Sequence, residues 1–117
     1  MKREDWIRLT HMRESVNAIL EFVQNHTRAD LENSRMLSSA IAREFEILGE
    51  AAGKISQETR NQFPDFPWRQ IIGMRNHLIH AYFNIDYDII WKTIHESLPP
   101  LRIRLEEAIS ANAASNS

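Results

Sequence analysis

Apolar residues recur at helical spacing along most of the chain. In the first stretch they stand at Trp6, Leu9, Val16, Ile19, Leu20 and Val23. This spacing predicts an amphipathic helix over residues 4–25, which the polar residues 25–27 end. A longer helix is predicted from Asp30, a residue type that caps helix N-termini, to Ser56. The small residues that would let a neighbouring helix approach it closely are Ala51, Ala52 and Gly53.

Prolines and a capping residue divide the second half of the chain. A loop is predicted at residues 64–67, with one short turn before it. Since Pro67 suits a helix start, a third main helix is predicted over residues 68–82. Asp86 is the predicted cap of the next helix, over residues 87–97.

The last helical stretch is interrupted by Pro99 and Pro100, which break or kink a helix. The apolar pattern resumes from Leu101 to about Ile109, and residues 111–117 are predicted to be a flexible tail. Four or five helices joined by short loops predict an all-α antiparallel bundle. The chain is therefore expected to form a single domain over residues 1–110.

The composition fits such a domain and narrows its chemistry. The 117 residues suit one hydrophobic core, and the share of apolar residues, 43%, is close to that of soluble proteins. The chain has no cysteine, which excludes disulfides, Fe–S clusters and thiol chemistry. It starts on a charged segment and has no apolar run near the roughly 20 residues that cross a bilayer. We therefore expect a soluble, cytoplasmic protein without a membrane partner.

The charges are unevenly placed. A net charge of −2 argues against a broad, non-specific nucleic-acid surface. Between residues 60 and 80, however, Arg60, Arg69 and Arg75 are opposed by Asp65 alone. A local basic spot is expected there.

Arg75 lies along the centre of an apolar stripe in the helix predicted over residues 68–82. At about 100° per residue, its neighbours on the stripe are Trp68, Ile71, Ile72, Leu78, Ile79 and Tyr82. Burying an unpaired guanidinium costs on the order of several kcal/mol, so an ordinary core would not place one there. Two readings remain open: a functional arginine, or a structural ion pair with Glu44, Glu46 or Glu50.

The opposite flank of this helix carries Arg69, Asn76 and His80, with Gly73 two turns before His80. A glycine in mid-helix costs about 1 kcal/mol relative to alanine, unless a backbone or a ligand comes close. Gly73 and Arg69 therefore predict a dimer seam or a substrate groove; the alternative is a solvated face with an incidental glycine. An ideal helix separates Arg75 from His80 by about 140°. The reach of arginine, a second protomer or a distorted helix end must bring them together.

The run Arg75-Asn76-His77-Leu78-Ile79-His80-Ala81-Tyr82 resembles the Arg-x4-His-x-Tyr motif of the HepT-like branch of the HEPN superfamily. The flanking sequence is similar too: Pro-Trp-Arg and Ile-Ile-Gly-Met-Arg-Asn before the motif, Ile85-Asp86 and Ile90-Trp91 after it. The resemblance covers residues 37–105 and is densest from 67 to 91. It implies a helical homodimer, the toxin of a type VII toxin–antitoxin pair, whose two motifs meet across a cleft and cut RNA without a metal.

The resemblance also implies roles for individual residues. His80 would be the general acid or base, and Arg75 would stabilise charge on the phosphoryl oxygens. Asn76 would orient His80 or the phosphate, and cleavage would leave a 2′,3′-cyclic phosphate. The implied partner is a minimal nucleotidyltransferase antitoxin that transfers AMP from ATP to Tyr82, where bulky anionic groups would block RNA. Without the resemblance, Tyr82 is simply a core-edge aromatic residue.

Two other functions are compatible with the sequence. His77 and His80, followed by Asp86, Asp88 and His95, suggest a metal enzyme. No carboxylate lies between the two histidines as in the His-Glu-x-x-His motif, so we expect neither a metal nor another cofactor. The second alternative is a non-catalytic helical module that binds a nucleotidyltransferase partner.

Overall fold

The fold is all-α, as predicted, but the described residues form more helices than the four or five expected. The computed structural model describes residues 1–80 and 84–115, and these contain seven helices and no strand. Their bounds are α1 Arg3–Phe22, α2 Arg28–Asn33, α3 Arg35–Lys54, α4 Gln57–Gln62, α5 Trp68–His80, α6 Tyr87–Glu96 and α7 Leu98–Ser115. The two short helices, α2 and α4, were not counted in the prediction. No helix within these ranges is long and apolar enough to cross a membrane.

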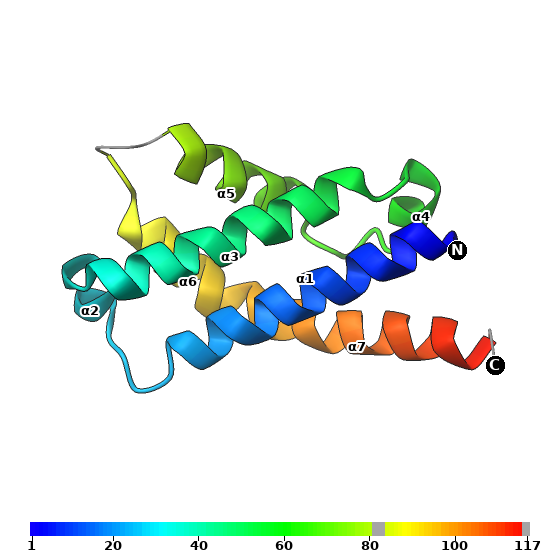
Figure 1. Ribbon diagram of the computed structural model, residues 1–117, viewed down its shortest axis with the longest axis horizontal. Coiled ribbons are helices and arrows are strands. Elements are labelled where there is room, and N and C mark those ends of the chain that lie inside the picture. Colours follow the sequence, from blue (N-terminus) through cyan, green and yellow to red (C-terminus); the bar gives the residue numbers. More distant parts are fainter. Residues whose placement is uncertain (81–83, 116–117) are drawn as a thin grey trace.

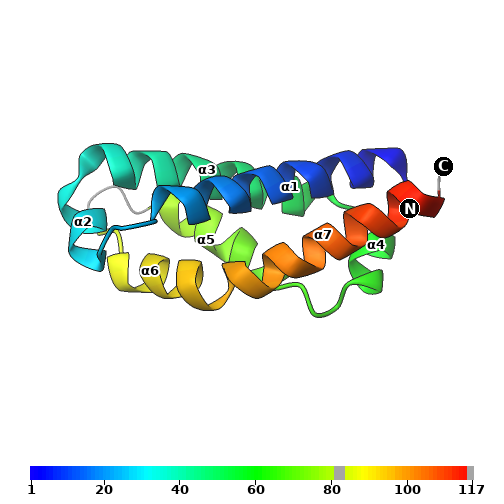
Figure 2. The same ribbon diagram turned by 90° about the horizontal axis from the view of Figure 1, so that it is seen from below.

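The helices form an elongated bundle of 46 × 28 × 20 Å. α3 packs against both α1 and α5, and α7 packs on the other side of α1 (Figure 1). α1 and α3 form one layer, while α6 and α7 form a second (Figure 2). The short α2 contacts both α3 and α6. α5 therefore lies at an edge of the molecule, with α3 as its main support.

The prediction of a single helix from Asp30 to Ser56 is wrong, because the helix is interrupted at Ser34. Thr27 rather than Asp30 caps α2: its side chain accepts from the backbone N–H of Asp30, whose carboxylate accepts from the N–H of Thr27 in return. Ser34 ends α2 and caps α3 by accepting from the N–H of Leu37 at 3.1 Å. Side-chain hydroxyls that compete for backbone groups split the predicted helix in two.

The later boundaries follow the prediction more closely. The short turn expected before the proline loop is α4, and α5 begins at Trp68. Asp86 caps α6 as predicted, since its carboxylate accepts from the N–H groups of Asp88 and Ile89, both at 3.1 Å. The helix predicted to end at Tyr82 is described as far as His80, because Tyr82 lies outside the described residues.

The last helix differs at both ends from the prediction. α7 begins at Leu98, so Pro99 and Pro100 lie in its first turn, where a missing N–H costs no helical hydrogen bond. It continues to Ser115 and not to Ile109. The rest of the predicted tail, residues 116–117, lies outside the described residues, and its flexibility stays a prediction.

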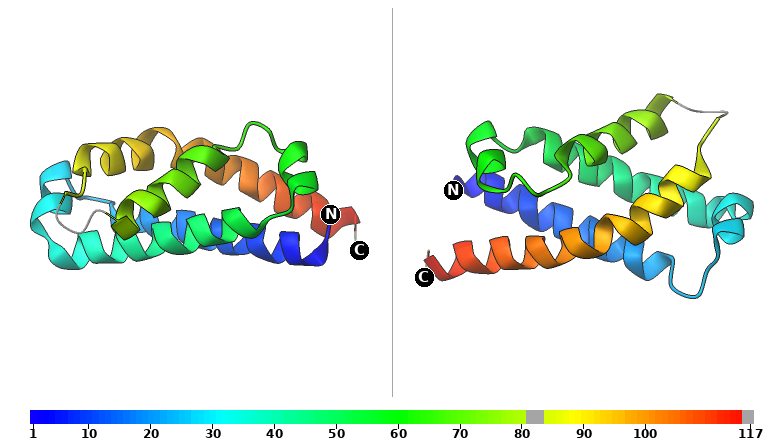
Figure 3. Two further views of the ribbon diagram at one scale, coloured as in Figure 1. Left: turned by 90° about the horizontal axis from the view of Figure 1, so that it is seen from above. Right: turned by 180° about the vertical axis from the view of Figure 1, so that it is seen from behind.

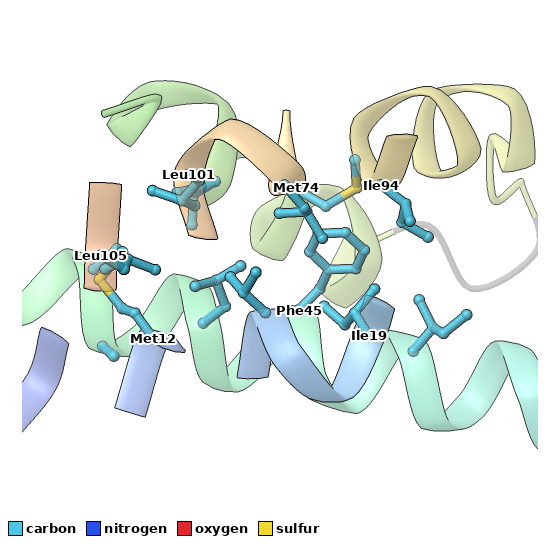
Figure 4. Close-up of a cluster of buried hydrophobic side chains, with 14 of the residues drawn as sticks. Met12, Ile19, Phe45, Met74, Ile94, Leu101 and Leu105 are labelled. Carbon is cyan, nitrogen blue, oxygen red and sulfur yellow. The ribbon is translucent and has the colours of Figure 1, made fainter. Parts of the chain in front are cut away.

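A continuous apolar core fills the space between the layers. α1, α3, α5, α6 and α7 all contribute, and their side chains meet around Phe45, which is fully buried (Figure 4). The residues labelled in that view are Met12, Ile19, Phe45, Met74, Ile94, Leu101 and Leu105.

One carboxylate is buried beside this core. Asp5, in the first turn of α1, is 3% exposed and accepts three hydrogen bonds from the start of α4. They come from the N–H and Oγ of Ser56, at 3.0 and 2.6 Å, and from Oγ1 of Thr59, at 2.7 Å. Burial alone would raise the pKa of Asp5, but these hydrogen bonds outweigh it and leave the pKa below its ordinary value. Asp5 therefore ties α1 to α4 as an anion.

Candidate functional site

α5 carries the residues that the sequence singled out, and its N-terminal end is firmly held. The indole Nε1 of Trp68 donates to the carbonyl of Phe63 at 2.9 Å, and the guanidinium of Arg60 stacks over the Trp68 ring. One face of the helix is buried through Ile71, Met74 and Leu78. The helix itself runs beside α3 in both views of Figure 3. α5 thus presents a defined inner face to α3 and leaves its outer face open.

Arg75 lies on the inner side of α5, against Gly49 of α3. A Cβ atom added to Gly49 would stand 2.5 Å from Cβ and 2.9 Å from Cδ of Arg75. Ordinary carbon contacts are about 3.5–4.0 Å, so only glycine allows the two helices to lie this close at Arg75. By contrast, a Cβ at Gly53, where close approach was predicted, would meet nothing within 4 Å. For Gly53 the prediction is wrong, and the close approach lies one helical turn earlier; the other two residues that it named, Ala51 and Ala52, are buried in the core.

The structural ion pair that the sequence left open for Arg75 is not formed among the described residues. Glu46 contacts Arg43 at 3.6 Å and Glu50 contacts Lys54 at 3.0 Å, while Nε of Arg75 is buried without a hydrogen-bond partner there. The pKa of Glu50 is lowered mainly by the hydrogen bond from Lys54, with a smaller contribution from the charge of Arg75. Arg75 is thus a half-buried cation near the carboxylate of Glu50, and within residues 1–80 and 84–115 its outer N–H groups have no hydrogen-bond partner.

The predicted polar flank is a real exposed stripe along α5. Arg69, Gly73, Asn76 and His80, spaced by three or four residues, are all exposed. A Cβ at Gly73 would meet nothing within 4 Å, so no close backbone in the described part of the chain explains that glycine. The stripe is therefore accessible to a ligand or to a second protein surface.

Arg75 and His80 do not come together within one chain. Arg75 faces α3, whereas His80 lies on the exposed stripe, and neither has a hydrogen bond or ion pair in the described part of the molecule. Tyr82, the predicted modification site, lies outside the described residues.

The predicted basic spot is smaller than the sequence suggested. The guanidinium of Arg60 donates to the carbonyls of Ala52, Gly53 and Ile55, at 2.9, 3.0 and 3.2 Å, and so caps the C-terminal end of α3. Arg60 is therefore structural. Arg69 and Arg75 carry the positive charge of the site.

The two histidines of α5 have separate environments. Nε2 of His77 accepts from the backbone N–H of Asp86 at 3.2 Å, whereas His80 is exposed. Within residues 1–80 and 84–115, no three His, Asp or Glu side chains gather in a way that could hold a metal ion. Sequence reasoning missed Gly49 and the contact of His77, because each depends on how two separate segments meet in the fold.

Comparison with known proteins bears on this arrangement. A family model described as Ribonuclease HepT-like matches residues 12–108. A protein of Methanocaldococcus jannaschii named "Putative RNase MJ1380" is 39% identical over 93 residues, 80% of this chain and 85% of that protein. The "Probable ribonuclease HepT" of Thermococcus cleftensis is 35% identical over 107 residues, 92% of this chain and 97% of its own length. No solved structure matches the chain. The chain belongs to the HepT-like ribonuclease family.

Proposed function

We propose that this protein is the toxin of a type VII toxin–antitoxin pair, a metal-independent endoribonuclease that acts on cytoplasmic RNA. The observation that carries the proposal is the state of Arg75. Helix packing at Gly49 holds this arginine in place, and no carboxylate of the described chain forms an ion pair with it. An arginine that is held in place without an ion pair, on the same helix as an exposed histidine, is suited to bind a phosphodiester.

The reaction would be an attack of the ribose 2′-hydroxyl on the neighbouring phosphorus. The bond between phosphorus and the 5′-oxygen breaks, which leaves a 2′,3′-cyclic phosphate and a 5′-hydroxyl. His80 removes the proton from the 2′-hydroxyl or supplies the proton to the leaving oxygen. Arg75 stabilises the charge on the non-bridging oxygens, and Asn76, one residue further along α5, orients the phosphate or His80.

The proposal includes a homodimer, because one chain holds Arg75 and His80 on different sides of α5. Two copies that meet along the exposed stripe would bring both motifs to a shared cleft. Gly73, the smallest residue of that stripe, would allow the two α5 helices to lie close together, with Arg69 at the rim. RNA would bind across the seam, and tRNA is the first substrate to try.

The proposed partner is a minimal nucleotidyltransferase that silences the toxin. It would transfer AMP from ATP to the phenol oxygen of Tyr82 and release pyrophosphate. The negative phosphate of the transferred AMP would repel the phosphates of RNA at the Arg75–His80 site. A Tyr82→Phe variant should then cut RNA whether or not the partner and ATP are present.

The decisive experiment incubates purified wild-type protein and His80→Ala with total RNA in excess EDTA. Mass spectrometry first verifies that Tyr82 carries no AMP. New fragments with 2′,3′-cyclic phosphate ends, made by the wild type alone, are the expected result. No cleavage by the unmodified wild type would refute the ribonuclease and favour a non-catalytic module that binds the nucleotidyltransferase.

A further inference from the structure

His77 makes an unusual contact for a residue inside the motif. It lies one turn before His80 on α5, and its Nε2 atom is 3.2 Å from the backbone nitrogen of Asp86. Because an N–H can only donate, the imidazole must accept through Nε2. His77 is therefore neutral in this contact and carries its proton on Nδ1. A group committed in this way cannot also exchange protons with RNA through Nε2.

The contact joins two helices at their ends. Asp86 caps α6 through its carboxylate, so the N–H that reaches His77 is the one that stands just outside α6. α6 is anchored in turn, because it packs on α7 and because Nε of Arg28, in α2, donates to Asp88 at 2.5 Å. His77 thereby links the last turn of α5 to a supported element.

The last turn of α5 needs this link. α5 rests chiefly on α3, and its last buried side chain is Leu78, while Asn76 and His80 are exposed. The ends of helices fray unless side chains or packing hold them. A frayed turn would move His80 relative to Arg75, and a displacement of about 1 Å costs on the order of 100-fold in rate.

We propose that His77 is a positioning residue, which fixes the last turn of α5 through the N–H of Asp86 and so sets where His80 stands. The inference rests on the proposed ribonuclease function. It assigns the two histidines of the motif different tasks: His80 transfers protons and His77 only accepts a hydrogen bond.

Glutamine separates these tasks. Its Oε1 atom is the same number of bonds from Cβ as Nε2 of histidine, so it can accept from the N–H of Asp86 but cannot transfer protons. We therefore compare His77→Gln, His77→Leu and His80→Gln, with His11→Leu, an exposed histidine of α1, as the matched control. Rates on a short RNA are measured in EDTA, together with the thermal unfolding of each variant.

The expected pattern has four parts. His77→Leu lowers kcat at least tenfold with little change in KM, because phosphate binding by Arg75 remains. His77→Gln restores kcat to within about threefold of the wild type, and His11→Leu leaves it unchanged. His80→Gln loses about 100-fold or more, the usual worth of a general acid or base. Wild-type kcat in folded His77→Leu, or equal losses in the two glutamine variants, would overturn the inference.

A second measurement examines the contact without RNA. In the wild type, nitrogen chemical shifts should show His77 protonated at Nδ1, and the amide of Asp86 should exchange slowly. Exchange should speed up in His77→Leu and slow again in His77→Gln. If the wild type cuts no RNA, the proposed function fails and the positioning role fails with it. Active His77→Leu beside an active wild type refutes the inference alone.

Discussion

The contact between Gly49 and Arg75 makes a sharp prediction for Gly49→Ala. The new methyl group would lie 2.5 Å from Cβ of Arg75, about 1 Å closer than carbon atoms normally approach. Cβ of Arg75 is attached to the backbone, so it cannot rotate away. Either α5 moves outward or the helices separate locally, and the guanidinium moves with them.

Two opposing effects set the stability of this variant. Overpacking costs about 1–3 kcal/mol. Replacing a mid-helix glycine by alanine returns about 1 kcal/mol of helix propensity. The net loss should therefore be about 0–2 kcal/mol, and the protein should stay folded. The rate of RNA cleavage should fall much more, by about 100-fold, because Arg75 is displaced by roughly 1 Å.

Gly53→Ala is the matched control on the same helix. Its methyl group would meet nothing within 4 Å, so it should stabilise the protein by up to about 1 kcal/mol and leave cleavage unchanged. Urea unfolding followed by circular dichroism gives the stabilities, and initial rates per folded molecule give the activities. If Gly49→Ala is as stable and as active as Gly53→Ala, helix packing does not position Arg75.

Three further predictions concern other parts of the molecule. Asp5→Asn should destabilise the protein by about 1–3 kcal/mol at neutral pH, measured by urea unfolding. Because the pKa of Asp5 is lowered in the folded state, its contribution to the free energy of unfolding is present above the unfolded pKa of about 3.9 and is lost as pH falls through the folded pKa. A stability difference between wild type and Asp5→Asn that stays constant down to about pH 2 would contradict this. Arg60→Ala should lower the free energy of unfolding by about 1–3 kcal/mol and leave the cleavage rate per folded molecule unchanged. A large loss of that rate would mean that Arg60 takes part in the site. Gly73→Leu should keep the fold but weaken the proposed dimer in light scattering, and unchanged mass and activity would refute the seam.

The sequence predicted the parts of the fold that depend on local pattern. Apolar spacing located α1, α5 and α6, and Asp86 was recognised as a cap because its partners are its near neighbours. The break at Ser34 was missed because a serine is compatible with either a helix interior or a cap. Only the structure shows that the Ser34 side chain accepts from the N–H of Leu37 and so starts a new helix.

The site was predictable to the same extent. The pattern placed Arg75 on the inner stripe of α5 and His80 on the outer one, as the structure has them. What surrounds them depends on tertiary contacts. Gly49 is 26 residues before Arg75, so the pattern of neither helix shows that the two residues meet, and the sequence singled out Gly53 and Gly73 instead. His77 was considered as a metal ligand because its acceptor role becomes visible only when the N–H of Asp86 is found 3.2 Å from its Nε2 atom.

The hydrogen bonds of the buried Asp5 carboxylate also suggest when α4 forms during folding. A helix of six residues cannot hold itself in water, and the hydroxyl of Ser56 that caps α4 donates to Asp5, 51 residues earlier in the chain. We therefore expect α4 to form after α1 has packed on α3 and to be among the first elements to open. Interactions made this late stabilise the native state without being present in the transition state. We therefore expect the hydrogen bonds of Asp5 to lower the rate of unfolding and to leave the rate of folding nearly unchanged.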